Sequence, residues 1–157
     1  MKTFDAFLAV SYKPACVSGS EYRHTIESLV DLAIVADLSI YVAPLEEQWG
    51  QVSPTRRQAI SCDHMAMQSC RVFVFFIGGF ESDGALVELG MALALKRQIL
   101  ILHFEKEVLS SHVQGLIEIG LAREIVLKSD VSLQTVASII ISCRDIVGQR
   151  LTEMIVA

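Results

Sequence analysis

The chain has 157 residues, of which 52% are hydrophobic and 20% charged, which predicts a single domain, 1–157, with a sizeable core. Its net charge of −5, without any Lys/Arg run, argues against a nucleic-acid partner, because such surfaces carry a basic stripe. The longest apolar run, 71–80, is too short to cross a bilayer, and the N-terminus lacks the pattern of a secretory signal. We therefore expect a cytoplasmic protein that does not interact with membranes.

Apolar strand-like runs alternate with helical patterns along the chain. The run RVFVFFIG is the strongest strand signal because it is short, aromatic and β-branched. We expect strands at 4–12, 38–45, 71–78, 98–104 and 123–128. Apolar residues spaced i, i+3, i+4 and i+7 indicate the first helix. We expect helices at 20–36, 53–70, 82–95, near 109–119 and near 131–153.

Two helix starts carry capping signals. Ser53 is expected at the N-cap of the helix at 53–70, with Pro54 at its first helical position, a favoured pairing. The helix at 82–95 is expected to be capped by Ser82 or Asp83. These signals place both helix starts next to loops, where side chains are free to meet a ligand.

The alternation of strands and helices predicts a parallel sheet with helices on both faces. Right-handed crossovers and five strands favour the order 2-1-3-4-5, so we expect a flavodoxin-like, Rossmann-like three-layer α/β sandwich. In this architecture ligands bind beyond the carboxyl ends of the strands, where the strand order reverses. That rule places 11–20, 78–84 and the end of the fourth strand on one rim. The least regular loops are 13–20 and 46–53.

The apolar content exceeds what one small core usually needs. A homo-oligomer, dimer or larger, would cover the excess, since large exposed apolar patches are rare on monomers. A sheet buried on both faces is the alternative explanation. The cysteines, with no C-x-x-C spacing and no metal pattern with the histidines, are expected to be buried free thiols. They are Cys16, Cys62, Cys70 and Cys143. No metal or organic cofactor is implied.

The segment GGFESDGALVEL, 78–89, follows the third expected strand. Gly78, Gly79 and Gly84 permit tight turns and close approach of a ligand to the backbone. Ser82 and the free amides of the next helix form a natural anion site. Glu88 would lie one turn further, where a sugar carbon could sit over its carboxylate. The alternative is that Ser82 and Asp83 only cap the helix, while Glu88 faces solvent or pairs with Lys96 or Arg97.

Two further residues are candidates for the same rim. Asp63 lies on the helix before the third strand, and the alternative for it is a surface carboxylate balanced by Arg56 or Arg57. Tyr12 ends the first strand, where a side chain would meet a ligand; the alternative is an ordinary strand-end aromatic. The histidines show no pairing with Ser or Cys of the kind that forms a nucleophilic triad.

The segment SDGALVELGMALALKRQILIL resembles the signature of the nucleoside 2-deoxyribosyltransferase superfamily, including its 2′-deoxynucleoside 5′-monophosphate N-glycosidase branch. The match is carried position by position by Ser82, Gly84, Glu88, Leu89, Gly90 and Ala92. Asp63 stands where the family has an Asp eight residues before its central strand. VLSSHVQG resembles the N-glycosidase branch, whose Ser reaches the phosphate of the neighbouring subunit, and Ser110 matches that Ser.

The resemblance implies cleavage or transfer of the N-glycosidic bond of nucleosides or their 5′-monophosphates. Glu88 would be the nucleophile at the anomeric carbon or would stabilise an oxocarbenium-like centre, and Asp63 would orient or protonate the departing base. The remaining implied roles are in binding. Phosphate would be held by Ser82, Gly84 and Ser110, and the sugar and base pocket would be lined by Ser11 and Tyr12, with Gly78 nearby.

The chain departs from the family pattern at several positions. Lys13 stands where the branch has Arg, Val87 replaces an aromatic residue, and Arg71 replaces an Asp. A Ser at position 82, where the transferases often have Asp, favours a phosphorylated ligand because an Asp would repel it. These differences leave the base and the size of the substrate open.

A competing resemblance is to the TIR domain. FDAFLAVSY is similar to its first box, and SCRVFVFFIGGFESDGALVEL to its third strand followed by a Ser six residues before a catalytic Glu. Enzymatic TIR domains cleave the nicotinamide N-glycosidic bond of NAD with that Glu, although the Trp-Cys pair expected before it is absent here. Both resemblances make Glu88 the centre of N-glycoside cleavage. A non-catalytic nucleotide-binding signalling module is the third alternative.

Overall fold

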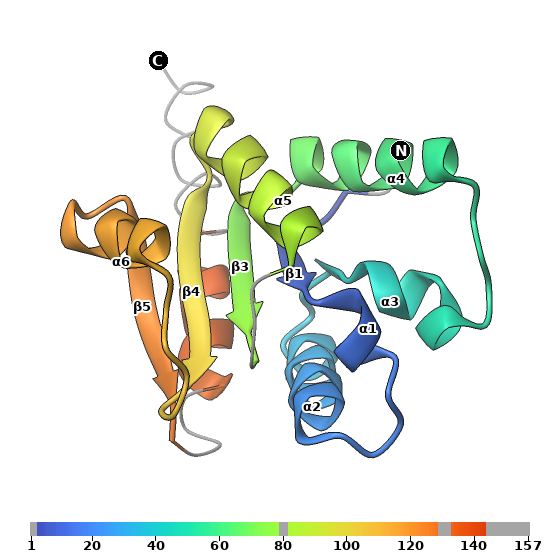
Figure 1. Ribbon diagram of the computed structural model, residues 1–157, viewed down its shortest axis with the longest axis horizontal. Helices are drawn as coiled ribbons and strands as arrows, with labels where there is room; N and C mark the ends of the chain where they lie inside the picture. Colours follow the sequence, from blue (N-terminus) through green and yellow to red (C-terminus); the bar gives the residue numbers. More distant parts are fainter. Residues whose placement is uncertain (1–2, 79–81, 129–132, 144–157) are drawn as a thin grey trace, which may run out of the picture.

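The computed structural model describes residues 3–78, 82–128 and 133–143, which form a three-layer α/β sandwich (Figure 1). Its single sheet has five parallel strands in the order β2-β1-β3-β4-β5, which confirms the predicted order. The strands are β1 (Ala6–Val10), β2 (Ile40–Tyr41), β3 (Val72–Ile77), β4 (Gln98–Phe104) and β5 (Ala122–Leu127). The helices are α1 (Tyr12–Ala15), α2 (Glu21–Val35), α3 (Ala43–Glu46), the 3-10 turn η1 (Gln48–Gly50), α4 (Arg56–Ser69), α5 (Asp83–Ala94) and α6 (Ser111–Glu118). A further helix covers 133–143.

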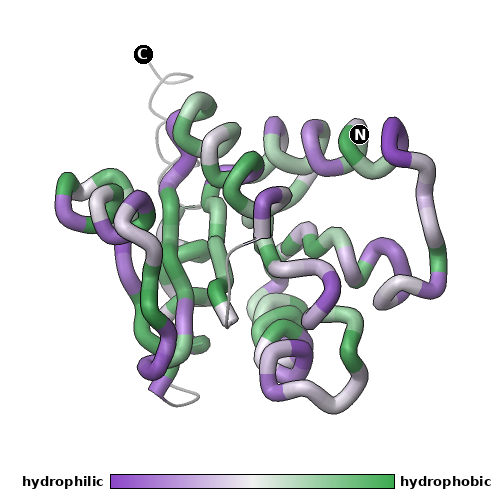
Figure 2. Tube along the Cα trace, viewed as in Figure 1, coloured by the Kyte–Doolittle hydropathy of each residue, from purple (hydrophilic) through white to green (hydrophobic). Residues whose placement is uncertain are grey.

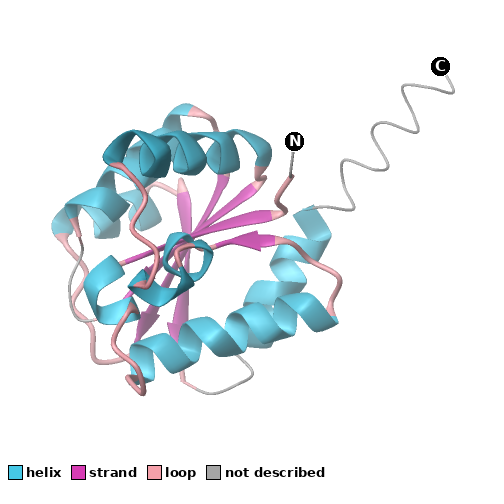
Figure 3. Ribbon diagram, turned by 90° about the vertical axis from the view of Figure 1, so that its right-hand side faces the viewer, coloured by secondary structure: helices cyan, strands magenta, loops and turns pink. Residues whose placement is uncertain are grey.

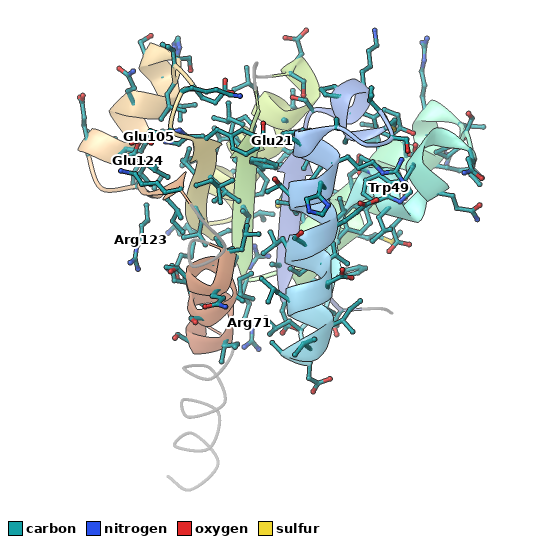
Figure 4. The ribbon with its side chains drawn as sticks, turned by 90° about the horizontal axis from the view of Figure 1, so that it is seen from below. Glu21, Trp49, Arg71, Glu105, Arg123 and Glu124 are labelled. Carbon is teal, nitrogen blue, oxygen red and sulfur yellow. The ribbon has the colours of Figure 1, made fainter. Side chains whose placement is uncertain are left out.

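The sheet separates two hydrophobic cores (Figure 3). Helix α2 and the helix at 133–143 lie beside each other on one face (Figure 4), and α4, α5 and α6 cover the other face. Strand β3 alternates between the cores: Val72, Val74 and Phe76 face α2, whereas the residues between them face α4 and α5. This double burial explains why β1 and β3 are continuously apolar (Figure 2).

Local structure departs from the sequence prediction at the segments that follow the first two strands. Strand β2 has only two residues, because α3 begins at Ala43 with Pro44 in its first turn. Helix α4 is capped by Thr55, so the prediction of Ser53 as N-cap and Pro54 as first helical residue is wrong. Thr55 and Gln58 form a reciprocal capping box, which satisfies two backbone donors at once.

The remaining boundaries lie close to the prediction. Strand β4 occupies the predicted 98–104, and Ser82 is the N-cap of α5. The part of the predicted C-terminal helix beyond 143 lies outside the described residues. All four cysteines are free, but Cys62 is exposed and only Cys70 is fully buried, so the expectation of buried thiols is wrong for Cys62. Among the described residues, no helix is both long and apolar enough to cross a membrane.

The fold brings three connections to one edge of the sheet. Strand β1 pairs with β2 on one side and with β3 on the other, so the strand order reverses beside it. The segments that follow β1, β2 and β3 therefore emerge together at the carboxyl edge, where open α/β sheets bind ligands. Helices α1, α3 and α5 begin in these segments (Figure 1).

Candidate active site

A cavity of about 530 Å³ opens at this switch point. Its volume falls in the range that suits a small molecule. Its walls come from β1, α1, α3, α4 and the first turns of α5. The lining residues are Phe7, Leu8, Val10, Tyr12, Lys13, Ala43, Pro44, Glu47, Ala59, Asp63, Ser82, Asp83, Gly84, Ala85 and Glu88. The cavity thus brings together five of the eight predicted site residues: Tyr12, Asp63, Ser82, Gly84 and Glu88.

Glu88 lies in the second turn of α5, partly buried against the cavity. Burial raises its pKa to about 8, and the nearby charge of Asp63 contributes to the rise. None of the described residues makes a hydrogen bond or ion pair with its carboxyl group. The alternative pairing with Arg97 is absent, because the Arg97 guanidinium donates instead to the carbonyl oxygen of Gln68 at 2.7 Å. Glu88 is therefore a carboxyl group with no protein partner in the described part of the chain.

Asp63 lies on α4, on the cavity wall next to Glu88. The Tyr41 hydroxyl donates a hydrogen bond of 2.8 Å to Asp63 Oδ1. The Tyr41 ring is itself fixed by ring contacts with Phe4 and Phe7, at centroid distances of 5.2 and 5.0 Å. Burial raises the pKa of Asp63, the Tyr41 hydrogen bond opposes that rise, and the charge of Glu47 adds to it. Asp63 is thus a partly buried carboxyl group with a fixed orientation.

The N-terminus of α5 forms the third wall of the cavity. The Ser82 side chain accepts a hydrogen bond of 3.3 Å from the Ala85 amide, as an N-cap residue does. The amides of Asp83 and Gly84 lie in the first turn, where a helix has no internal acceptors for them. Lys13 lines the same cavity from α1. A helix N-terminus beside a lysine favours an anionic group.

Tyr12 is the first residue of α1, so the prediction that it ends the first strand is wrong: β1 stops at Val10. The Ser11 amide donates to the Tyr22 hydroxyl at 2.9 Å, and that hydroxyl donates to the carbonyl oxygen of Phe76 at 2.9 Å. These bonds tie the start of α1 to the end of β3. The Tyr12 hydroxyl donates to Glu47 Oε2. Ser11 itself is buried and is not among the lining residues.

Two other predicted site residues lie away from the cavity lining. A Cβ atom on Gly78 would lie 2.1 Å from Cδ2 of Tyr22, so glycine is needed there to accommodate the tyrosine ring. Ser110 is the N-cap of α6 and accepts from the Val113 amide at 3.4 Å. Neither residue lines the cavity of a single chain. Gly79 lies outside the described residues.

Sequence reasoning did not select Glu47, and it noted Lys13 only as a departure from the family pattern. Glu47 ends α3 and is followed by Gln48, Trp49 and Gly50, which have positive φ values of 50°, 57° and 86°. A non-glycine residue in this region costs on the order of 1 kcal/mol. The irregular loop 46–53 was a usable signal, because it follows a strand that neighbours the switch point.

The charges around the cavity are unbalanced. Among the described residues, its lining includes the carboxyl groups of Glu47, Asp63, Asp83 and Glu88 but only one basic side chain, Lys13. Within the described part of the chain, no group of His, Cys, Asp and Glu side chains is arranged to hold a metal ion. Two partly buried carboxyl groups with raised pKa values in one cavity are suited to acid–base and nucleophilic chemistry.

The fold and this cavity define a flavodoxin-like α/β protein with an acidic site at the switch point. Two solved structures share the fold. The CMP N-glycosidase BcmB of Clostridium botulinum is 23% identical with a TM-score of 0.62, covering 83% of this chain and 95% of that chain. BlsM, known from a solution structure, is 23% identical with a TM-score of 0.71, covering 91% of this chain and 93% of that chain.

The predicted resemblance to 5′-monophosphate N-glycosidases is thus confirmed at the level of the fold. At this degree of identity the likeness concerns the fold alone. No protein-family model matches the sequence, and no curated protein matches it significantly.

Proposed function

We propose that this protein is an N-glycosidase that cleaves the bond between the sugar and the base of nucleoside 5′-monophosphates. The observation that carries the proposal is the Glu88 carboxyl group, partly buried in a cavity without a partner among the described residues, beside Asp63. Burying an unpaired carboxyl group opposes folding, and such groups cluster at functional sites. The fold shared with a CMP N-glycosidase supports the same conclusion.

The two carboxyl groups take complementary roles in the reaction. As the C1′–N bond breaks, its electron pair leaves with the base, and Asp63 donates a proton to the base. Glu88 stabilises the positive charge that develops at C1′, or attacks that carbon. Water then supplies the hydroxyl group at C1′, and its proton returns to Asp63. Transfer to a second base in place of water is the variant reaction.

The raised pKa values of both groups suit these roles. Around neutral pH the pair retains a proton, which is the proton that the departing base requires. Positive charge that develops at the anomeric carbon favours the ionised form of Glu88, and in the proposed reaction the departing base takes its proton from Asp63.

The proposed 5′-phosphate site lies at the start of α5. Lys13, Ser82 and the first residues of α5 line the cavity, and the phosphate would be held by the first-turn amides, the Ser82 hydroxyl and the Lys13 ammonium group. Glu88, one turn further along α5, would then lie beneath the sugar. Tyr12 would contact the sugar or base from the opposite wall.

A homodimer is part of the proposal. Large apolar side chains are exposed on the outer surfaces of α4 and α5, where they would be buried by a second copy. They are Ile60, Met65, Leu86 and Val87. Ser110, which is not part of the single-chain cavity, would reach a phosphate only from the neighbouring subunit.

The test is chromatography of free bases after incubation with 2′-deoxynucleoside and ribonucleoside 5′-monophosphates, with free nucleosides plus a second base, and with NAD. The wild type is compared with Glu88→Ala. The proposal is supported if the wild type releases base from monophosphates and Glu88→Ala does not. Base exchange would show that the protein is a transferase. Release of nicotinamide from NAD would favour the TIR-type alternative, and no release by a folded protein would overturn the enzymatic proposal.

A further inference from the structure

Glu47 is a third carboxyl group of the cavity wall, and the proposed reaction assigns it no role. It ends α3, is partly buried and lines the cavity opposite α5. The Tyr12 hydroxyl donates to its Oε2 atom. Its Oε1 atom has no partner among the described residues. The inference drawn from Glu47 rests on the proposed N-glycosidase function.

The backbone holds Glu47 in one place. Its amide donates to the carbonyl oxygen of Ala43 at 3.1 Å, and its own carbonyl oxygen accepts from the amides of Gly50 and Val52, each at 3.1 Å. The left-handed turn at Gln48, Trp49 and Gly50 makes these last two bonds possible.

Side-chain packing fixes the same turn. The Arg23 guanidinium of α2 lies over the Trp49 ring, 4.2 Å from its centroid. Gly50 approaches Tyr12 and Cys16 closely: a Cβ atom there would lie 3.8 Å from the Tyr12 hydroxyl and 3.4 Å from Cys16 Sγ. A backbone held in a sparsely populated conformation beside a cavity points to a functional constraint.

Three of the four carboxyl groups in the lining come from different segments of the chain. Glu88 belongs to α5 and Asp63 to α4, Glu47 is the C-cap residue of α3, and all three line the cavity. The charge of Asp63 acts on Glu88, and the charge of Glu47 acts on Asp63. In the proposed reaction the sugar lies at Glu88 and the glycosidic nitrogen at Asp63. The edge of the base that is farthest from the sugar would then lie at Glu47.

The chemistry of a carboxylate decides what it selects there. An ionised carboxylate only accepts hydrogen bonds, and the Tyr12 hydroxyl already occupies one oxygen of Glu47. The free oxygen attracts an amino group on the base and repels a carbonyl oxygen in the same position. We propose that Glu47 reads the base, so that the enzyme accepts bases with an exocyclic amino group and rejects their oxo counterparts.

Two pairs of nearly isosteric substrates test this proposal: CMP with UMP, and AMP with IMP. In each pair an amino group is exchanged for a carbonyl oxygen at the same ring position. We expect kcat/KM of the wild type to favour the amino member of the preferred pair by roughly tenfold to a hundredfold, as for a hydrogen bond to a charged group. In Glu47→Gln the amide can donate as well as accept, so the preference should fall to about threefold or less.

Glu46→Gln is the matched control, because Glu46 is the adjacent carboxylate of α3 but is exposed and does not line the cavity. Its preference should equal that of the wild type. Active wild type with an unchanged preference in Glu47→Gln would overturn the role of Glu47 and leave the proposed function intact. Equal loss of preference in both variants would also overturn it, since a general charge effect would then suffice.

Binding gives a measurement that does not depend on turnover. Calorimetric titration of Glu88→Gln with the same four nucleotides should show tighter binding of the amino members, and Glu88→Gln/Glu47→Gln should lose that difference. If the wild type released no base, the proposed function would fail, but the difference in binding would still decide the role of Glu47. If none of the four nucleotides bound, the role of Glu47 would be overturned as well.

Discussion

Ionisable side chains gather at the carboxyl ends of two pairs of strands, and the two groups differ in how their charge is balanced. Beside β1 and β3, Glu88 lies in a cavity of about 530 Å³ without a partner among the described residues. Beside β4 and β5, a second cavity of about 480 Å³ contains His103 and Glu124, whose Nε2 and Oε1 atoms are 2.9 Å apart.

These two regions lie toward opposite edges of the sheet, as the positions of Trp49 and Glu124 show in Figure 4. His103 satisfies its second ring nitrogen as well, since Nδ1 lies 2.8 Å from the carbonyl oxygen of Phe104. His103 and Glu124 therefore stabilise each other within the protein. In the first cavity Glu88 has no such partner among the described residues, and Asp63 and Glu47 each accept a hydrogen bond from a tyrosine hydroxyl but pair with no cation there, which leaves these carboxyl groups available to a ligand. Acidic residues are present in both regions. What distinguishes the candidate active site from a structural cluster is that its central carboxyl group has no ion-pair or hydrogen-bond partner among the described residues.

The largest expected effect is on activity, when the carboxylate of the first region, Glu88, is replaced, and the matched substitution in the second region is at Glu124. Glu88→Gln should lower kcat/KM for base release by a factor on the order of 10³, because it removes the group that stabilises charge at C1′. Glu124→Gln should change it less than about threefold, because Glu124 lies in the other cavity. Steady-state kinetics on the preferred monophosphate measures both. Near-wild-type activity in Glu88→Gln would remove the distinction between the two regions.

Asp63→Asn is expected to have the next largest effect. Loss of a general acid should lower kcat by about 10²-fold. Tyr41→Phe is the matched control: it removes the hydrogen bond to Asp63 but keeps the ring packing. Because that hydrogen bond lowers the pKa of Asp63, its loss should move the alkaline limb of the kcat profile to higher pH. An alkaline limb that is identical in wild type and Tyr41→Phe would show that another group supplies the proton.

Substitutions at the proposed phosphate site, at the start of α5 and at Lys13, are expected to have the third largest effect. Ser82→Asp should weaken binding of monophosphates about tenfold more than binding of the corresponding nucleosides, through repulsion of like charges. Lys13→Gln should shift the same ratio in the same direction, since Lys13 is the basic side chain of the lining. Inhibition constants of non-hydrolysed analogues provide the measurement. Equal losses for phosphorylated and unphosphorylated ligands would show that no phosphate binds at the start of α5.

The sequence was a good guide where patterns are local or repeat along the chain. The continuous apolar run of β3 and the alternation of strands and helices indicate a sheet buried on both faces. Ser82 was one of two candidate caps, with Asp83, before an apolar helix, and it is the N-cap. Glu88 and Asp63 could be found because each lies on a regular helix near the switch point. Their shared cavity could not be read from spacing, because it depends on how α4 and α5 pack.

Glu47 shows where local patterns are insufficient. Its position depends on a left-handed turn that includes Gln48 and Trp49, two residues with no intrinsic preference for positive φ. The contacts that hold this turn come from α2, far away in the sequence. The misplaced cap of α4 has a similar origin: Ser53 and Pro54 fit a common pattern, but the reciprocal bonds of Thr55 and Gln58 stabilise a later start.

The smallest predicted effect concerns stability as a function of pH. In the folded protein the pKa of Glu88 is about 8, above its ordinary value of 4.5. Between these values the folded state holds more protons than the unfolded state, so the free energy of unfolding should fall as pH rises from about 5 to 8. With partial exposure and coupling to Asp63, we expect Glu88 to account for about 1–2 kcal/mol of this fall.

Glu88→Gln cannot ionise, so it should be more stable than the wild type at pH 8 and should differ little from it at pH 5. Glu124→Gln should show no such gain at pH 8, because it breaks a satisfied pair with His103 and relieves no burial of charge. Urea midpoints of the three proteins at the two pH values measure the difference. A gain in both variants, or in neither, would mean that the two regions balance their charge in the same way, and the comparison between them would fail.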